Sequence, residues 1–213
     1  MTPTRSTHKQ KDNFSELTEE QIREIKNQTE EKARISWDKL SEDQQSTFKT
    51  SWFAGFWEGE GSLTCSVKRV PHVRFGYQFV NEVSVTQHVS GIQYLWWAKH
   101  NLFHDVGNIT YKKGSDATFT YQFSKTEALT NHFIPWYESN VLPFASVAGV
   151  NHWNQWVQIV ELKKTTAKWN LTDVHKCATL VYGLNSKKGR QRKIPLEELL
   201  NHLAAWVSTL KKK

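Results

Sequence analysis

The sequence predicts an α+β domain in which helices cover one face of a four-stranded antiparallel sheet. Three observations support this prediction: two pairs of segments alternate between apolar and polar residues, helical patterns lie before, between and after these pairs, and ten Trp and eleven Phe can fill a large core. The predicted order is helix, two strands, helix, two strands, helix (αββαββα), followed by further helices. Alternation with a period of two leaves the other face of the sheet polar and open.

The charge of the chain is unevenly distributed. Residues 1–45 carry eight Lys or Arg and ten Asp or Glu, whereas the whole chain has a net charge of +7. We predict that residues 1–44 form a polar, partly helical N-terminal extension and that residues 45–213 form one domain. The basic excess lies in that domain, which favours an anionic partner.

Several classes of protein are not indicated. The two cysteines, Cys65 and Cys177, suggest neither a disulfide framework nor a zinc site, so a reducing compartment is expected. No apolar run approaches the roughly 20 residues of a membrane helix, and no secretory signal is present, so we expect no membrane partner. No nucleotide-binding glycine pattern or nucleophile elbow occurs, and no small-molecule substrate is expected.

A helix is predicted from about residue 43 to residue 59, and its end lies in the segment FAGFWEGEG, residues 53–61. Phe53, Phe56 and Trp57 would form one apolar face. Gly55 is four residues before Gly59, a spacing that permits another backbone to approach closely. The glycines on both sides of Glu60 allow a sharp turn that holds this carboxylate at the end of the helix.

Strand alternation begins directly after this segment. Core-facing residues fall at odd-numbered positions from Leu63 to Val85, with a turn near residues 70–73, and the opposite face is rich in hydrogen-bonding side chains. A helix is predicted at 89–102, followed by a second hairpin with a turn at Gly114-Ser115. The strands of that hairpin are predicted at 106–113 and 116–123, and later helices at about 125–140, 150–163, 171–184 and 195–210.

Residues 53–61 resemble the motif of the LAGLIDADG homing endonucleases, with Glu at both acidic positions. Residues 45–210 resemble more closely the single-motif, homodimeric type encoded by group I introns of algal chloroplast rRNA genes, including the segments 81–89, 113–118 and 134–138. One motif per chain implies a homodimer joined through the motif helices. The interface residues that this resemblance implies are Phe53, Ala54, Gly55, Trp57 and Glu58.

The resemblance implies a site-specific endonuclease that cuts a long pseudo-palindromic site in double-stranded DNA by metal-dependent hydrolysis. In the family, the second acidic residue of each motif binds a divalent metal, a role that falls on Glu60. A backbone carbonyl of the adjacent turn, at Gly59 or Gly61, is expected as a further ligand. Mg²⁺ is expected, with Mn²⁺ as a substitute. Gln87 matches a family glutamine that organises water near the scissile phosphate. A basic residue that the family often has is missing from residues 146–152, where His152 is an alternative.

The resemblance also implies a set of DNA contacts. Family matching suggests Tyr111 on the second hairpin, whereas simple alternation turns Lys112 outward. The basic segment 187–193 resembles a loop that grips DNA phosphates. The complete DNA-binding set is Ser66, Lys68, Arg74, Gln78, Ser84, Tyr111, Lys113, Thr118, Thr120, Lys187, Lys188, Arg190, Arg192 and Lys193.

Two other interpretations stay open. One is a catalytically weak RNA maturase or DNA-binding regulator with the same fold, although the presence of Glu60 favours the enzyme. The other is a helical interaction protein, which would require the strand alternation to be accidental. For the enzyme we expect an organelle-encoded protein, of the chloroplast first and of the mitochondrion second.

Overall fold

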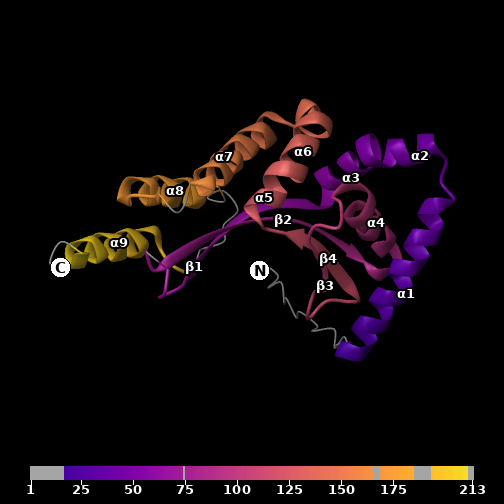
Figure 1. Ribbon diagram of the computed structural model, residues 1–213, viewed down its shortest axis with the longest axis horizontal. Coiled ribbons are helices and arrows are strands. Elements are labelled where there is room, and N and C mark those ends of the chain that lie inside the picture. The colour runs from indigo at the N-terminus through magenta and orange to yellow at the C-terminus, as the bar shows by residue number, and fades with distance from the viewer. Residues whose placement is uncertain (1–16, 74, 166–167, 185–192, 211–213) are drawn as a thin grey trace, which may run out of the picture.

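The computed structural model describes residues 17–73, 75–165, 168–184 and 193–210 of the 213-residue chain (Figure 1). None of the described helices is both long and apolar enough to cross a membrane. In chain order the elements are α1 (Glu19–Asp38), α2 (Glu42–Thr47), η1 (Phe48–Trp52), α3 (Phe53–Glu60), β1 (Gly61–Arg69), β2 (Tyr77–His88), η2 (Val89–Gly91), α4 (Ile92–Trp97), η3 (Ala98–Leu102), β3 (Asn108–Tyr111), β4 (Thr118–Phe123), α5 (Thr126–Ala128), η4 (Leu129–Phe133), α6 (Ile134–Asn140), η5 (Leu142–Phe144), α7 (Val147–Lys164), α8 (Leu171–Gly183) and α9 (Leu196–Leu210).

The four strands form one antiparallel sheet in the order β1-β2-β4-β3. In β2 the odd-numbered side chains from Tyr77 to Val85 are buried and the even-numbered ones are not. The same alternation buries Phe119, Tyr121 and Phe123 of β4. The predicted α+β class, the four-stranded antiparallel sheet and the αββαββα order are therefore confirmed.

The helices pack on the odd-numbered face of the sheet. Figure 1 shows α5, α6, α7 and α8 together on one side of β1 and β2. The indole of Trp156 in α7 donates a hydrogen bond to the carbonyl of Thr64 in β1 (3.0 Å). The rings of Phe103 and Phe123 lie 5.4 Å apart in the same layer. The even-numbered side chains of the sheet consequently lie outside the main hydrophobic core.

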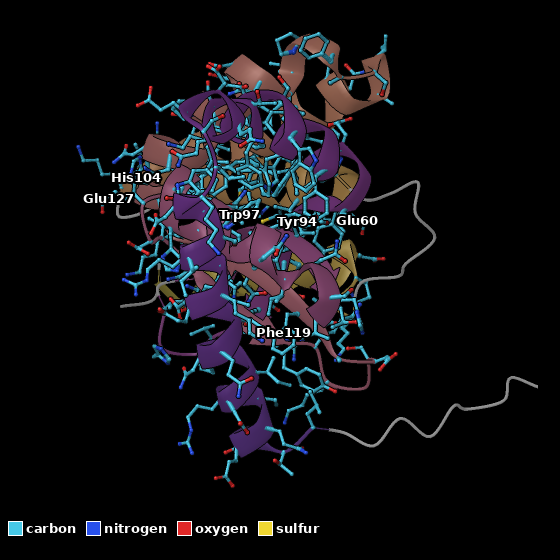
Figure 2. All side chains as sticks on the ribbon, turned by 90° about the vertical axis from the view of Figure 1, so that its right-hand side faces the viewer. Glu60, Tyr94, Trp97, His104, Phe119 and Glu127 are labelled. Carbon is cyan, nitrogen blue, oxygen red and sulfur yellow. The ribbon has the colours of Figure 1, made fainter. Side chains whose placement is uncertain are left out.

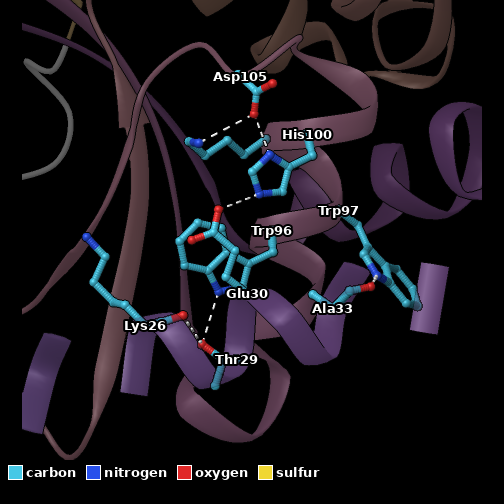
Figure 3. Close-up of polar contacts among 9 residues, drawn as sticks. Lys26, Thr29, Glu30, Ala33, Trp96, Trp97, His100 and Asp105 are labelled. Carbon is cyan, nitrogen blue, oxygen red and sulfur yellow. Dashed lines mark hydrogen bonds and ion pairs between the residues drawn. The ribbon is translucent and has the colours of Figure 1, made fainter. Parts of the chain in front are cut away.

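The described part of the predicted N-terminal extension contains the 20-residue helix α1, which packs along α4. The indole of Trp97 donates a hydrogen bond to the carbonyl of Ala33 (2.8 Å). Figure 3 shows His100 between Glu30 and Asp105, with 2.9 Å from its Nε2 to the Glu30 carboxylate. The hydrogen bond from His100 lowers the pKa of the Asp105 carboxyl. These contacts attach α1 to the rest of the described chain. The predicted boundary between the N-terminal extension and the domain, at residue 44, stays a prediction.

The helix that carries the motif contains a π-helical turn, η1, between α2 and α3. The sequence predicted an uninterrupted helix, and the total extent, residues 42–60, agrees with that prediction within one residue at each end. The carbonyl of Lys49 in this turn accepts a hydrogen bond from the indole of Trp136 in α6 (2.8 Å). Wide turns of this kind are rare and occur often at functional sites. Here the turn ties the motif helix to α6.

The junction between α3 and β1 has no space for a side chain at Gly61. A methyl group there would lie 2.5 Å from two ring carbons of Trp57 and from its carbonyl oxygen. Overpacking costs about 1–3 kcal/mol, and here a buried ring and the backbone must both move. We therefore expect Gly61→Ala to lower the free energy of unfolding by about 2 kcal/mol or more, measured by urea denaturation.

Gly149→Ala, in the first turn of α7, is the matched control for this substitution, because a methyl group added at Gly149 would make ordinary contacts of 3.4 Å with Ala145 and Ser146. Alanine also favours the helix over glycine by up to about 1 kcal/mol. This variant should therefore be at least as stable as the wild type. Equal destabilisation by both substitutions would contradict the close packing at Gly61.

Candidate active site and nucleic-acid interface

The even-numbered side chains of the sheet form a polar surface, which we call the open face. Cross-strand neighbours on it include Ser84 opposite Gln122, and Thr86 opposite Thr120 with their hydroxyl oxygens 3.1 Å apart. Such hydroxyl and amide groups can donate to and accept from base edges. The open face consists of Ser62, Thr64, Ser66, Lys68, Gln78, Val80, Glu82, Ser84, Thr86, His88, Asn108, Thr110, Thr118, Thr120 and Gln122.

Most of the described DNA-binding candidates lie on or beside the open face. Ser66, Lys68 and Gln78 are exposed there. Lys113 is exposed in the turn between β3 and β4. The remaining members on the face are Ser84, Thr118 and Thr120. Their contacts with DNA stay predictions.

Tyr111 lies on the opposite face, and its assignment as a DNA contact is corrected. Its ring packs against Phe119 at 5.7 Å, and its hydroxyl donates a hydrogen bond to the carbonyl of Ser115 (3.0 Å). The register of the second hairpin explains this, because it pairs Tyr111 with the buried Phe119 and the exposed Thr110 with Thr120. Simple alternation therefore gave the right orientation for this strand.

The basic segment near the C-terminus is described only at its end. Lys193 is exposed and lies shortly before α9. In α9, Glu198 forms an ion pair with Arg69, and the Nδ1 atom of His202 lies 2.9 Å from the Tyr77 hydroxyl. These contacts place α9 beside the tip of the first hairpin. Outside the described residues lie Arg74, Lys187, Lys188, Arg190 and Arg192.

Glu60 is the last residue of α3, and its side chain is exposed (Figure 2). The extended backbone of Gly61 begins β1 directly after it, so Glu60 precedes the first residue of the open face, Ser62. Gly61 pairs with Val85 in β2. This register brings Gly59, Glu60 and Gln87, which lies two residues beyond Val85, to the same end of the β1–β2 pair.

Gln87 is partly exposed at the end of β2. Its Oε1 atom accepts a hydrogen bond from the backbone N–H of His88 (2.8 Å). Close to this end of the sheet, the Nε2 atom of His152 lies 3.2 Å from the carbonyl of Leu63. Ser146, in the region without a basic residue, caps α7 by accepting a hydrogen bond from the backbone N–H of Gly149 (3.1 Å).

The donor set around Glu60 fits a hard divalent cation that retains open coordination positions. Within the described residues, no three His, Cys, Asp or Glu side chains are grouped so as to hold a metal ion. One chain therefore offers the Glu60 carboxylate with neighbouring backbone carbonyls such as that of Gly59. Mg²⁺ prefers oxygen ligands and usually retains several waters, whereas a structural zinc site needs four protein ligands.

Glu58, the first acidic residue of the motif, lies beside Tyr137 of α6. Burial and the neighbouring Glu58 carboxylate raise the pKa of Tyr137 to about 12, so its hydroxyl stays protonated at neutral pH. Both residues line a cleft of about 750 Å³ that also contacts Ser62 and His152. The structure thus gives Glu58 a neighbour within its own chain, and its role in a dimer interface stays a prediction.

Two of the predicted interface residues face the core of their own chain. Phe53 and Trp57 are 0% and 4% exposed. Helix α6 and the turn before it cover them, with ring centroids 5.4 Å apart for Phe53 and Trp136 and 4.8 Å apart for Trp57 and Phe133. Their assignment to the dimer interface is therefore corrected. Ala54, at 7% exposed, is buried as well.

The uncovered side of the motif helix carries a different set, which we call the exposed stripe: Trp52, Gly55, Phe56 and Gly59. Trp52 is 41% exposed, and its ring stacks on Phe56 (5.4 Å) and approaches Tyr94 of α4 (4.5 Å). Beyond the surrounding helical turn, no atom of the described residues lies within 4 Å of a methyl group added at either glycine. Sequence reasoning missed Trp52, although its positions relative to Gly55, Phe56 and Gly59 follow the helical period.

Comparison with known proteins finds similarity to LAGLIDADG endonucleases. Residues 53–157 match the LAGLIDADG endonuclease family. DNA endonuclease I-CeuI from Chlamydomonas moewusii is 33% identical over 132 residues, which span 62% of this chain and 60% of that relative. The fold is similar to that of the group I intron-encoded homing endonuclease I-CeuI complexed with DNA, with a TM-score of 0.67, 26% identity and coverage of 86% and 93% of the two chains.

The archaeal intron-encoded homing endonuclease I-Vdi141I, also complexed with DNA, has a similar fold with a TM-score of 0.65. It is 22% identical, and the match covers 74% of this chain and 95% of that one. At this level of identity the similarity supports the fold, which agrees with the sheet and helix order described above.

Proposed function

Because residues 53–157 match the LAGLIDADG endonuclease family, we propose that the chain belongs to this family and is a site-specific endonuclease of double-stranded DNA that acts as a homodimer. The observation that carries this proposal is the position of Glu60. Its exposed side chain is at the end of the motif helix, two residues before Ser62, the first residue of the open face. A group that can bind a metal ion thus lies next to a surface that can bind DNA.

The open face suits the major groove, which accommodates a β-ribbon and presents base edges to hydroxyl, amide and charged side chains. The net charge of +7 supports attraction to the phosphate backbone. In this proposal the exposed lysines near the face, such as Lys68 and Lys113, contact phosphates, while the shorter polar side chains in its interior contact bases.

The exposed stripe supports a dimer. Gly55 costs the helix about 1 kcal/mol relative to alanine, and the structure leaves space for a methyl group at this position. A second motif helix could approach at Gly55 and Gly59, with Trp52 and Phe56 packing beside the contact. In a two-fold pair the same surface serves both copies. Two Glu60 carboxylates would then lie near the dimer axis, where one chain alone provides one.

A bound divalent metal ion supplies a Lewis acid and a water of lowered pKa for phosphodiester hydrolysis. In this chain Glu60 would hold the ion, with the Gly59 carbonyl as an additional ligand. Gln87, at the same end of the sheet, would orient a water molecule by hydrogen bonding. The family match supports dependence on a divalent metal, and we propose that the ion is Mg²⁺ with Mn²⁺ as a substitute.

The similarity to a Chlamydomonas intron endonuclease supports a role in intron homing. We propose that the chain cuts one pseudo-palindromic site, is encoded in an organelle, and works in the chloroplast.

A second candidate function is a maturase or a DNA-binding regulator with weak cleavage. The absence of Lys and Arg from residues 146–152 favours this candidate, because Ser146 serves only as a helix cap there. This candidate predicts binding to a defined nucleic-acid site without efficient cutting.

A duplex library with a randomised core of about two DNA turns tests the proposal, since a two-fold dimer reads half-sites about one turn apart. Protein is allowed to bind in Ca²⁺, and bound duplexes are then exposed to Mg²⁺ or to a chelator. We expect one enriched pseudo-palindrome that is cut in both strands with Mg²⁺ only. Enrichment without cutting would favour the second candidate, and no enrichment would reject both.

Substitution of Lys68 tests the phosphate contacts. Lys68→Ala removes a cation at the exposed end of β1. We expect weaker binding to all duplexes and a fall of about one, per chain, in the slope of log affinity against log salt concentration. Fluorescence anisotropy between about 50 and 200 mM salt, the range over which such contacts act strongly, measures this slope. Lys176→Ala, at an exposed position in α8, is the control, and an equal effect there would contradict a local contact.

A further inference from the structure

The open face contains one unusual side chain, Glu82. Among the described residues of that face it is the only acidic one. It lies on the central strand β2, opposite Thr64 of β1, and it is partly buried. The ion pairs formed by the described part of the chain do not include it. Glu82 is thus an unneutralised carboxylate in the interior of a surface that otherwise suits a polyanion.

A carboxylate in this position weakens binding to any phosphate backbone, because like charges repel. It can compensate only by accepting a hydrogen bond from a group on the DNA. In the major groove the exocyclic amino groups of cytosine and adenine are the donors. Adenine carries the acceptor N7 beside its amino group, and guanine and thymine carry acceptor oxygens or nitrogens at their edges. These acceptor atoms repel a carboxylate. Cytosine N4 is therefore the best partner.

We propose that Glu82 is a specificity-determining residue that selects a cytosine at one position in each half-site of the DNA target. The inference rests on the proposed DNA-binding function of the open face. It adds a base identity that the family relation does not supply, because it follows from the chemistry of this side chain and from its place on the central strand.

The neighbours of Glu82 agree with this role. On the same face, Thr64 lies across the strand and Ser84 lies two residues along β2. Neither carries a charge, so neither draws the carboxylate into an ion pair. Lys68 is four residues from Thr64 along β1 and is paired with Gln78, at the other end of the hairpin. The Glu82 carboxylate consequently stays available for a base.

The test compares sites selected from a random duplex library by the wild type, Glu82→Gln and Glu82→Ala. We expect the wild type to prefer cytosine at one position per half-site by about 5-fold to 150-fold over the other bases. Glutamine pairs with adenine through N6 and N7, so Glu82→Gln should shift that one position to adenine. Glu82→Ala should lose the preference there and retain the rest of the site.

If Glu82 only repels the DNA phosphates, the two variants should give a different result. If Glu82 is only a solvated surface residue, both variants should bind all duplexes more tightly by a common factor and select an unchanged site. That outcome overturns the inference. Glu138→Gln, at an exposed position in α6, is the matched control and should select the wild-type site.

This test distinguishes failure of the proposed function from failure of the proposed role of Glu82. If the wild type enriches no sequence, the proposed DNA-binding function is rejected, and the inference about Glu82 fails with it. If the wild type enriches a site that neither Glu82 variant changes, the proposed function stands and the role of Glu82 is rejected.

Discussion

Replacing Glu60 with glutamine should abolish DNA cleavage and leave DNA binding intact. Glutamine retains the size of the side chain and loses the negative charge that a hard cation requires. Stabilisation by a bound metal ion contributes several kcal/mol to hydrolysis of this kind, so the cleavage rate should fall by about 1000-fold or more. Single-turnover cleavage in Mg²⁺ measures the rate, and anisotropy in Ca²⁺ measures the affinity, which should change by less than about three-fold.

Glu42→Gln is the control for this experiment, because Glu42 is an exposed carboxylate in the first turn of α2, outside the motif. It should cleave at the wild-type rate. If the Glu60→Gln protein still cuts within about ten-fold of the wild-type rate, the substitution raises the activation free energy by less than about 1.4 kcal/mol. That result would show that Glu60 does not hold the metal ion.

Gly55→Leu should convert the dimer into a folded monomer. Beyond its own helical turn, a methyl group added at this position meets no atom of the described residues within 4 Å, and leucine favours a helix over glycine by about 0.8 kcal/mol. The monomer should therefore fold at least as well as the wild type. In the proposed dimer, however, the added side chain occupies the space where the partner's helix must approach. Sedimentation equilibrium should show the mass of one chain, 24.8 kDa, in place of twice that mass.

Ser139→Leu, which adds the same side chain at an exposed position of α6, should stay dimeric. Cleavage should also be lost in Gly55→Leu, because the two Glu60 carboxylates no longer meet. A Gly55→Leu protein with the dimer mass and normal cleavage would place the interface elsewhere on the chain.

The sheet was predictable from the sequence because its signal is local. Alternation from Leu63 to Val85 and from Phe119 to Phe123 needs no knowledge of distant residues, and the structure places these side chains on the core face. The position of Glu60 at the end of a helix followed from the two glycines around it. These features depend on periodicity and on turn chemistry, which act over a few residues.

The two faces of the motif helix could not be distinguished in this way. Both carry aromatic residues, with Phe53 and Trp57 on one side and Trp52 and Phe56 on the other. Which side is buried depends on Phe133 and Trp136 around the start of α6, far along the chain from the motif. Contacts of this range leave no local pattern. The family resemblance therefore assigned Phe53 and Trp57 to the dimer interface, whereas the structure buries both within their own chain.

The orientation of Tyr111 shows a different difficulty. Strand β3 has four residues, too few to fix its alternation from the sequence. Its register is set by pairing with β4, where Tyr111 lies opposite Phe119. Matching to a family pattern placed this side chain one position out of phase, and a shift of one residue moves a side chain to the other face of a sheet.

The most direct measurement is cleavage of the chain's own expected target: an uninterrupted copy of the gene that flanks its reading frame, incubated with wild-type protein and Mg²⁺. We expect one double-strand cut, close to the junction where the intervening sequence would insert, and no cut when the metal is chelated. Tight binding at that junction without any cut, in Mg²⁺ and in Mn²⁺ alike, would contradict a metal-dependent homing endonuclease.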